Sequence, residues 1–465
     1  MTSSPAIKSF LPVVDRSGSN SISGQISGAL RSAILDGRLP QGARLPSWKD
    51  LADQLGVARG TVRAAYDTLA DELLVVPAGA SGTRVRHDGR SSAPVAAARP
   101  LPLAGIVSAP LPFQLGLPAQ DALPAKLWSR LCARAARREA ASLGGRPDPR
   151  GSAALREQIA AMLAITRSVS CTPDQVFLTT GYGSGLWLTI QVLEAAGKQV
   201  WHEDPGCPLT RRGLGLAGVD LVPVPVDQDG IRVDHGLAIA PTARLAVVTP
   251  SAQAPTGASL SQHRRKDLLG WAERVGGWIV EDDSRGGLQL VRPSAPALAA
   301  QDSAGRVIHI GAFEQTLSPA VGLGYVVAPK ALTARFAQVA AALNPAPGVT
   351  TQAALAAFIG DGHYLRHLRQ MKRLYRDRKA ALEAALQGRV ATADAAPLAL
   401  SVRLAAGVDD VALARRALDF GIAPAPLSSW RHDRSAARPG LLLGVTNVHA
   451  GNLDAACAGL LELVS

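Results

Sequence analysis

Three side chains near the start of one predicted helix, Arg59, Thr61 and Arg63, are of types that bind DNA bases and phosphates. Apolar residues at helical spacing predict this helix from about Ala58 to Leu73. Its buried stripe is expected to comprise Val62, Ala65, Tyr66 and Leu69. The three polar side chains lie off that stripe. Because a recognition helix presents its base-reading side chains from its N-terminal end, the pattern predicts contact with DNA.

The elements around this helix follow the order helix, turn, helix, hairpin. Ser47 is a suitable N-cap for a second helix over residues 48–55. Gly56 permits a left-handed turn between that helix and the next one. Further on, the short segments 75–76 and 83–85 flank a Gly-containing turn and predict a two-stranded wing. This order of elements, with exposed arginines, is typical of DNA-binding proteins.

A second group of candidate residues, Asp282 and Asp283, follows the apolar run 278–281. That run is one of several strand-like segments that alternate with helical patterns from Leu111 onward. The others include residues 175–179, 219–224, 245–248 and 307–310. Such alternation predicts a mostly parallel sheet covered by helices. The two carboxylates could belong to a binding site or to a solvated strand end, and Pro250–Gly257 could be a structural turn.

The chain has 465 residues, enough for two or three domains, and a formal net charge of +12. The charge favours a polyanionic partner, although an Arg-rich genome would produce the same excess. The cysteines are scattered without a CxxC pair, so neither a zinc site nor a disulfide framework is expected. The first residues do not resemble a signal peptide and no apolar run suits a membrane span, so we expect a cytoplasmic protein without membrane contact.

The stretch GRLPQGARLPSWKDLADQLGVARGTVRAAYDTLADE, followed by SGTRV, resembles the winged helix-turn-helix of the GntR family of bacterial regulators. The resemblance implies binding to double-stranded DNA. The residues implied in this binding are Arg44, Ser47, Lys49, Arg59, Thr61, Arg63, Gly82 and Thr83. Arg59 is the leading candidate, because an arginine bidentate to guanine supplies about 1–3 kcal/mol of discrimination. Ala58 departs from the family, which commonly has Ser there.

From Phe113 to its end, the chain resembles the class I/II aminotransferase-like domain of fold type I, and the whole chain resembles the MocR subfamily of GntR regulators. The motifs HEDPGCP, TPSAQAPTG, WIVEDD and IGAFEQTL carry this resemblance. It implies an α/β fold with a mixed, mostly parallel sheet, helices on both faces and a smaller C-terminal α+β subdomain. The predicted parts are a DNA-binding domain at 20–87, an Ala-, Pro- and Ser-rich linker at 88–110, and an aminotransferase-like domain at 111–465, whose large part spans about 150–345 and whose small part spans about 346–465.

The catalysis of aminotransferases depends on a lysine, which forms a Schiff base with pyridoxal phosphate. The family's GTFSKTL is GAFEQTL here, so Gln315 takes the place of the lysine, and an amide nitrogen cannot form that bond. Four more positions lack a residue that the family uses at the cofactor site. The phosphate-binding arginine is Gly322, the tyrosine after EDD is Ser284, the aromatic of EDPGYP is Cys207 and the histidine of PSHQFPTG is Ala252.

Two parts of the implied cofactor site remain. Asp282 matches the acid that pairs with the pyridine nitrogen, and the turn Gly181–Ser184 lies at a helix start, which attracts anions. The residues assigned to this residual site are Gly183, Ser184, Asp282 and Gln315. We therefore expect pyridoxal phosphate to bind without a covalent bond or not at all, and we expect no catalytic residue and no metal.

The sequence thus predicts a DNA-binding transcriptional regulator whose aminotransferase-like domain forms a homodimer and senses a small-molecule effector without covalent catalysis. One alternative is a pyridoxal-phosphate-dependent aminotransferase with a DNA-binding head, and another is a repressor whose body only dimerises. A helix expected from His363 to about Leu386 carries four arginines at spacings of 3, 4 and 3. These arginines, Arg366, Arg369, Arg373 and Arg376, could form a solvated face or contact DNA or a second subunit.

Overall fold

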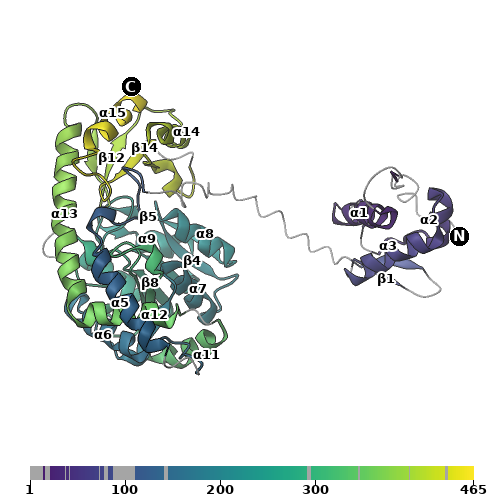
Figure 1. Ribbon diagram of the computed structural model, residues 1–465, viewed down its shortest axis with the longest axis horizontal. Helices are drawn as coiled ribbons and strands as arrows, with labels where there is room; N and C mark the ends of the chain where they lie inside the picture. Colours follow the sequence, from purple (N-terminus) through teal and green to yellow (C-terminus); the bar gives the residue numbers. More distant parts are fainter. Residues whose placement is uncertain are drawn as a thin grey trace. The chain divides into compact units, whose positions relative to one another are not determined.

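The computed structural model describes residues 14–15, 21–36, 38–40, 42–72, 74–77, 82–86, 110–140, 145–290, 295–343, 346–396, 398–434 and 438–464. The chain forms two compact units, Met1–Ile106 and Val107–Ser465, called the head and the body below (Figure 1). Apart from Pro110, the expected linker at 88–110 lies outside the described residues. The domain boundaries proposed from the sequence stay predictions.

The described part of the head consists of three helices and a hairpin in the predicted order. Helices α1 (Ile22–Leu35), α2 (Trp48–Leu55) and α3 (Arg59–Asp71) precede strands β1 (Val75–Pro77) and β2 (Thr83–Val85), which pair antiparallel. The buried stripe predicted for α3 is confirmed, because its four side chains are between 0% and 6% exposed. They pack with side chains of α1, α2 and the hairpin in one apolar cluster. This packing fixes α3 through the face opposite its exposed arginines.

Helices α2 and α3 begin in different ways. The Ser47 Oγ accepts a hydrogen bond from the Asp50 N–H at 3.1 Å, which confirms Ser47 as the N-cap of α2. Gly56 makes the expected left-handed turn with a φ of 61°. Ala58 is the N-cap of α3, with φ −67° and ψ 141°, and makes no side-chain capping bond. The first turn of α3 therefore lacks the acceptor that serves α2.

The body is built on an eight-stranded sheet with the order β3-β10-β9-β8-β7-β4-β5-β6 (Figure 1). The neighbours from β9 to β5 are parallel, whereas β10 is antiparallel to both of its neighbours and β6 is antiparallel to β5. The sheet is thus mixed and mostly parallel, as expected. Its strands are β3 (Val176–Thr179), β4 (Gln199–Asp204), β5 (Asp220–Asp227), β6 (Gly230–Ile231), β7 (Leu245–Val248), β8 (Trp278–Asp282), β9 (Val307–Ala312) and β10 (Gly324–Val327).

Alternate side chains along these strands enter cores on opposite faces of the sheet. Val247 and Val326 pack with helices on one face, whereas Val248 and Val327 pack on the other. The first face is covered by α7 (Tyr182–Val192), α8 (Pro208–Leu216) and α11 (Thr333–Leu343). The second is covered by α5 (Ala125–Glu139), α6 (Ala153–Arg167), α9 (Val233–Ile239), α10 (Gln262–Val275), α12 (Val349–Gly360) and the start of α13 (His363–Leu386). Helices on both faces confirm the expected layering.

A second, antiparallel sheet with the order β11-β12-β14-β13 forms the C-terminal part of the body. Its elements are β11 (Thr392–Asp394), β12 (Ala399–Arg403), α14 (Asp410–Arg416), β13 (Ala425–Pro426), β14 (Gly440–Gly444) and α15 (Leu453–Val464). Helix α13 joins both parts of the body (Figure 1). Met371 belongs to the core under the large sheet, and Leu386 belongs to the core of the small one.

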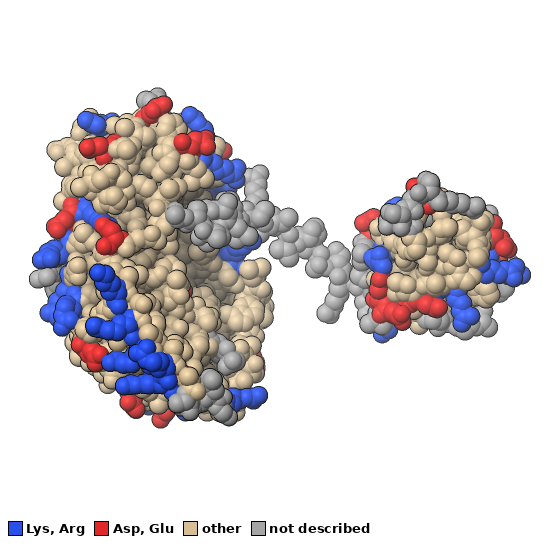
Figure 2. All heavy atoms as spheres, in the orientation of Figure 1, with Lys and Arg blue, Asp and Glu red and all other residues tan. Residues whose placement is uncertain are grey.

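Basic side chains gather over α5 and α13 on one side of the body (Figure 2). The four arginines predicted for one face of α13 are all exposed. Arg369 and Arg376 donate through Nε to carbonyl oxygens of their own helix, at 3.2 and 3.1 Å. Exposure agrees with a solvated helix face and also with a contact surface, so both interpretations stay open.

No helix within the described ranges combines the length and the hydropathy of a membrane span. The four cysteines, Cys132, Cys171, Cys207 and Cys457, are free thiols. In the part of the chain that the structure describes, no group of three His, Cys, Asp or Glu side chains is placed to hold a metal ion.

Replacing Ala58 with Ser should stabilise the start of α3. The backbone angles at Ala58 suit an N-cap, and the new hydroxyl can accept an N–H of the first turn, which contributes about 1 kcal/mol. Amide hydrogens of α3 in the full-length protein should then exchange about fivefold more slowly. The matched control is Ser47→Ala, which should accelerate exchange in α2. Unchanged exchange in α3 of Ala58→Ser would contradict the absence of a cap.

Candidate functional site

Three segments of the head carry its candidate DNA contacts, and the backbone ties them together. Arg44 pairs with Arg84 of β2 in an antiparallel bridge, and the N–H of the next residue donates to the Thr83 carbonyl at 2.8 Å. The Tyr66 hydroxyl on α3 donates to the Pro46 carbonyl at 3.0 Å. The hairpin, the segment before α2 and helix α3 are therefore held in one arrangement.

Four basic side chains, Arg44, Lys49, Arg59 and Arg63, are exposed on this arrangement. The ion pairs found among the described head residues involve other side chains. Of the remaining predicted contacts, Ser47 is exposed, and Thr61, Gly82 and Thr83 are half-buried. Exposed cationic groups without an internal carboxylate partner suit the binding of phosphates and base edges.

The tip of the hairpin depends on glycine. Gly82 has a φ of +88°, and a Cβ there would lie 2.9 Å from the Arg44 Nε. Sequence reasoning missed Arg84, which is exposed on the hairpin and donates through Nη1 to the Gly42 carbonyl at 2.9 Å. The alternation along β2 could have identified it, since burial of Val85 turns the preceding side chain to the opposite face.

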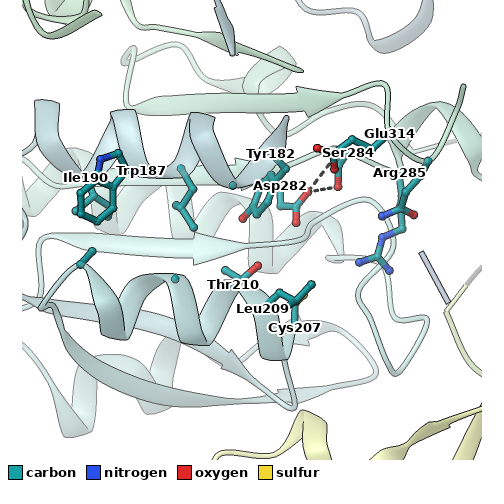
Figure 3. Close-up of a pocket in the computed structure, with 15 residues that line it drawn as sticks. Tyr182, Trp187, Ile190, Cys207, Leu209, Thr210, Asp282, Ser284, Arg285 and Glu314 are labelled. Carbon is teal, nitrogen blue, oxygen red and sulfur yellow. Dashed lines mark hydrogen bonds between the residues drawn. The ribbon is translucent and has the colours of Figure 1, made fainter. Parts of the chain in front are cut away.

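In the body, a cavity of about 240 Å³ lies beside the carboxyl end of β8 (Figure 3). It is lined by the start of α7, by α8, and by the segments that follow β8 and β9. Three of the predicted cofactor-site residues, Gly183, Asp282 and Gln315, meet on its wall. Ser184 does not line it. Ser284 and Cys207, two positions that depart from the aminotransferase pattern, do line it.

Asp282 and Asp283 at the end of β8 are only 7% and 6% exposed, so the alternative of a solvated strand end is wrong. Asp282 lines the cavity, where its Oδ1 accepts the backbone N–H of Ser284 at 3.0 Å and the Ser284 hydroxyl at 2.5 Å (Figure 3). Burial raises the pKa of Asp282 against the opposing effect of the nearby Arg285 guanidinium. Among the described residues, the Asp282 carboxylate thus has a hydrogen-bond partner for Oδ1 only.

Asp283 binds a different set of groups. The Arg167 guanidinium donates to both of its oxygens, at 2.7 and 2.8 Å, and the Ser251 hydroxyl donates to Oδ1 at 3.0 Å. Nearby, the His309 Nδ1 lies 3.0 Å from the Glu281 carboxylate, and both side chains are fully buried. The buried, bidentate ion pair between Arg167 and Asp283 anchors the end of β8 to α6 and holds Asp282 in place at the cavity.

The segment Pro250–Gly257 is a hydrogen-bonded turn. The Gly257 N–H donates to the Gln253 carbonyl at 2.7 Å, and the Gln253 N–H donates to the Ala258 carbonyl at 2.9 Å. Ala252, at the family's histidine position, is buried and does not line the cavity. The structural-turn interpretation agrees with these bonds.

A carboxylate of the chain itself occupies the start of α7. The Glu314 carboxylate lies beside Gly181, where the Tyr182 backbone N–H favours its ionised form. A Cβ on Gly181, whose φ is +117°, would lie 1.7 Å from the Glu314 Oε1, so only glycine leaves room for this carboxylate. Burial and the neighbouring Asp282 raise the pKa of Glu314. Sequence reasoning missed Glu314, although its replacement of the serine in GTFSKTL was a signal.

Pyridoxal phosphate does not fit the residues at this place. The resemblance assigns the turn Gly181–Ser184 to the cofactor phosphate, but Glu314 already binds there and repels a second anion. Gly322 supplies no positive charge where the family has arginine, and Gln315 supplies no amine. The cavity therefore keeps Asp282 of the implied cofactor site, but it lacks the lysine and the arginine that the resemblance assigns to binding the cofactor.

Two known families match this chain. Residues 22–85 match the gntR family of bacterial regulatory proteins, and residues 123–419 match the class I and II aminotransferases. The probable rhizopine catabolism regulatory protein MocR of Rhizobium meliloti is 33% identical, over 94% of this chain and 92% of its own. The HTH-type transcriptional regulator TauR of Rhodobacter capsulatus is 34% identical over 80% of each chain. This chain belongs to the MocR-type GntR regulators.

Solved aminotransferases share the fold of the body. An archaeal alanine:glyoxylate aminotransferase superimposes with a TM-score of 0.71 at 21% identity, covering 78% of this chain and 92% of the enzyme. The kynurenine aminotransferase of Pyrococcus horikoshii gives 0.69 at 21% identity with the same coverage. These likenesses confirm the fold type I assignment for the MocR-type body. The protein is a DNA-binding transcriptional regulator with an aminotransferase-like domain, as its relatives are.

Removing the buried guanidinium beside the cavity should strongly destabilise the body of this MocR-type regulator. Arg167→Met leaves the Asp283 carboxylate buried without its cation, which costs about 3–5 kcal/mol of unfolding free energy. Urea unfolding followed by tryptophan fluorescence measures the loss. The control Arg373→Met, at an exposed position of α13, should change stability by about 0.5 kcal/mol or less. Equal effects of both variants would show that the ion pair contributes nothing.

Proposed function

We propose that Arg59 makes the base contact that gives this regulator its DNA specificity, and that two heads of a homodimer read two half-sites. The observation that carries this proposal is the exposure of Arg59 and Arg63 at the start of α3, opposite its buried stripe. Phosphate contacts come from Arg44 and Lys49, and backbone contacts come from Gly82 and Thr83 at the hairpin tip. Half-site spacing then follows from the dimer and the linker.

The body acts as the dimerisation and sensing module of this regulator and performs no covalent cofactor chemistry. Gln315 lines the cavity at the family's lysine position, and its amide is not nucleophilic enough to form a Schiff base. A ligand changes DNA affinity only when it binds one conformation of the body better than another. The cavity is the place where such a ligand binds.

The alternative of an active aminotransferase requires an amine that the cavity wall does not supply. The alternative of a body that only dimerises leaves the cavity without a role. Treatment with pyridoxal phosphate and borohydride separates the first alternative from the proposal, and ligand titrations with DNA affinity as a readout separate the second.

Arg59→Ala should weaken binding to a DNA fragment that the wild-type protein selects from a random-sequence library. Loss of a bidentate guanine contact predicts about a tenfold to hundredfold weaker affinity by fluorescence anisotropy at fixed salt. The control is Arg31→Ala, which removes the same charge from α1, where Arg31 pairs with Glu72 beyond the C-terminal end of α3. Equal affinities of the two variants would refute the role of Arg59.

The purified wild-type protein, incubated with pyridoxal phosphate, should show no aldimine absorbance. Borohydride treatment with one equivalent of pyridoxal phosphate should leave its mass unchanged, because Gln315 offers no amine in the cavity and exposed lysines react only with excess aldehyde. A known aminotransferase treated in the same way is the positive control. A cofactor adduct trapped on any lysine of the body would restore the enzyme interpretation.

A further inference from the structure

The cavity beside β8 has acidic groups at one end and apolar side chains along its walls (Figure 3). Asp282 and Glu314 form the acidic end, and Leu186, Ile190 and Leu209 contribute to the walls. An apolar pocket with a few placed polar groups is typical of small-molecule sites. Its volume of about 240 Å³ lies below the roughly 300–1,000 Å³ of drug-sized pockets, so the occupant is small.

Three polar atoms at this end lack a hydrogen-bond partner in the described part of the protein: the Asp282 Oδ2, the Arg285 Nε and the Tyr182 hydroxyl. The Oδ1 of Asp282 takes both bonds from Ser284, while no described donor reaches Oδ2. The Nε of Arg285, which also lines the cavity, is buried without a partner. Buried polar groups are normally satisfied by protein, water or ligand. Asp282 is more than nine-tenths buried, and its Oδ2 and the Tyr182 hydroxyl oxygen can both accept a hydrogen bond. They therefore point to a ligand that donates hydrogen bonds at the acidic end, whereas an ammonium group would leave the Arg285 Nε unpaired.

The charges at this end select the sign of the ligand. The Asp282 and Glu314 carboxyl groups and the Arg285 guanidinium carry one net negative charge when both carboxyls are ionised. Burial raises the pKa of both carboxyls, so this end of the cavity favours an added positive charge. In a poorly solvated cavity a further anion adds repulsion, whereas a single cation balances the set. Glu314 also lies at the start of α7, so a phosphate bound there would meet a carboxylate at close range.

We propose that this cavity binds a small organic cation, a protonated primary amine with an apolar body, and that Glu314 excludes phosphorylated ligands. The ammonium group donates to the Asp282 Oδ2 and balances the charge of Glu314. The apolar body lies against Leu186, Ile190 and Leu209. The proposal rests on the sensing role proposed for the body and names the chemical class of its ligand.

Isothermal titration of the full-length protein at neutral pH tests the proposal. The probes are butylamine, 2-phenylethylamine and tryptamine, each compared with the alcohol of the same skeleton, together with pyridoxal phosphate and inorganic phosphate. At least one amine should bind about tenfold or more tightly than its alcohol, because its ammonium group adds a charged hydrogen bond. Pyridoxal phosphate and inorganic phosphate should not bind the wild type.

Two conservative variants locate the effect. Glu314→Gln and Asp282→Asn should each weaken the best amine about tenfold. Glu314→Ala should additionally free the start of α7 and let phosphate bind. The control Glu383→Gln, on the exposed face of α13, should change neither the affinity for the amine nor the affinity for phosphate. Circular dichroism identifies any variant that fails to fold. If Glu314→Ala fails to fold, the amine affinity of the nearly isosteric Glu314→Gln still tests the role of the Glu314 carboxylate.

The proposal is overturned if no amine exceeds its alcohol, if Glu314→Gln leaves amine affinity unchanged, or if the wild type binds pyridoxal phosphate as tightly as Glu314→Ala does. DNA affinity, measured in the same samples with and without the amine, separates this result from the proposed function. Amine binding with unchanged DNA affinity supports the ligand class and refutes the sensing role. A change in DNA affinity on amine binding supports both.

Discussion

The N–H groups at the start of a helix favour negative charge, and at the start of α7 the Glu314 carboxylate provides it from within the chain. Much of the cavity follows from this contact. Position 181 must be glycine, because any Cβ would overlap the carboxylate. The segment after β9 is held against α7, which places Gln315 on the cavity wall. Asp282 then faces a second carboxylate, and the two together make one end of the cavity acidic.

The buried ion pair between Arg167 and Asp283 fixes the position of the neighbouring Asp282. Arg167 and Ser251 bind Asp283, so the chain that leaves β8 cannot rotate freely and Asp282 stays directed to the cavity. The scaffold of an aminotransferase is thus preserved in its packing, while Gln315 and Gly322 differ from the residues that the family resemblance implies at those positions. Packing and chemistry separate in this way because apolar cores stabilise the fold, whereas catalytic groups contribute little to stability.

The head follows a related division between packing and recognition. The apolar stripe of α3 is buried in the core of the head, and the Tyr66 hydroxyl fixes the helix to the segment before α2. The opposite face is left to Arg59 and Arg63, which have no packing role. A regulator can therefore change the bases it reads without disturbing the core that positions the recognition helix.

The sequence by itself determined the elements, because apolar periodicity is a local property of the chain. The stripe of α3, the cap at Ser47, the limits of α13 and the alternation of strands with helices were all predictable. The assignment of Gln315 to the family's lysine position stays a prediction, and it required only a comparison of residue types with the family motif.

The tertiary structure alone decided which groups share one environment. Glu314 and Gly181 are far apart in the sequence, so no local pattern shows that the carboxylate fills the space beside that glycine. The burial of Asp282 and Asp283 also depends on helices packed over the end of β8, and the exposure of Arg84 depends on the core beneath β2. The net charge around the cavity comes from side chains of distant segments, and only folding brings these side chains close to one another.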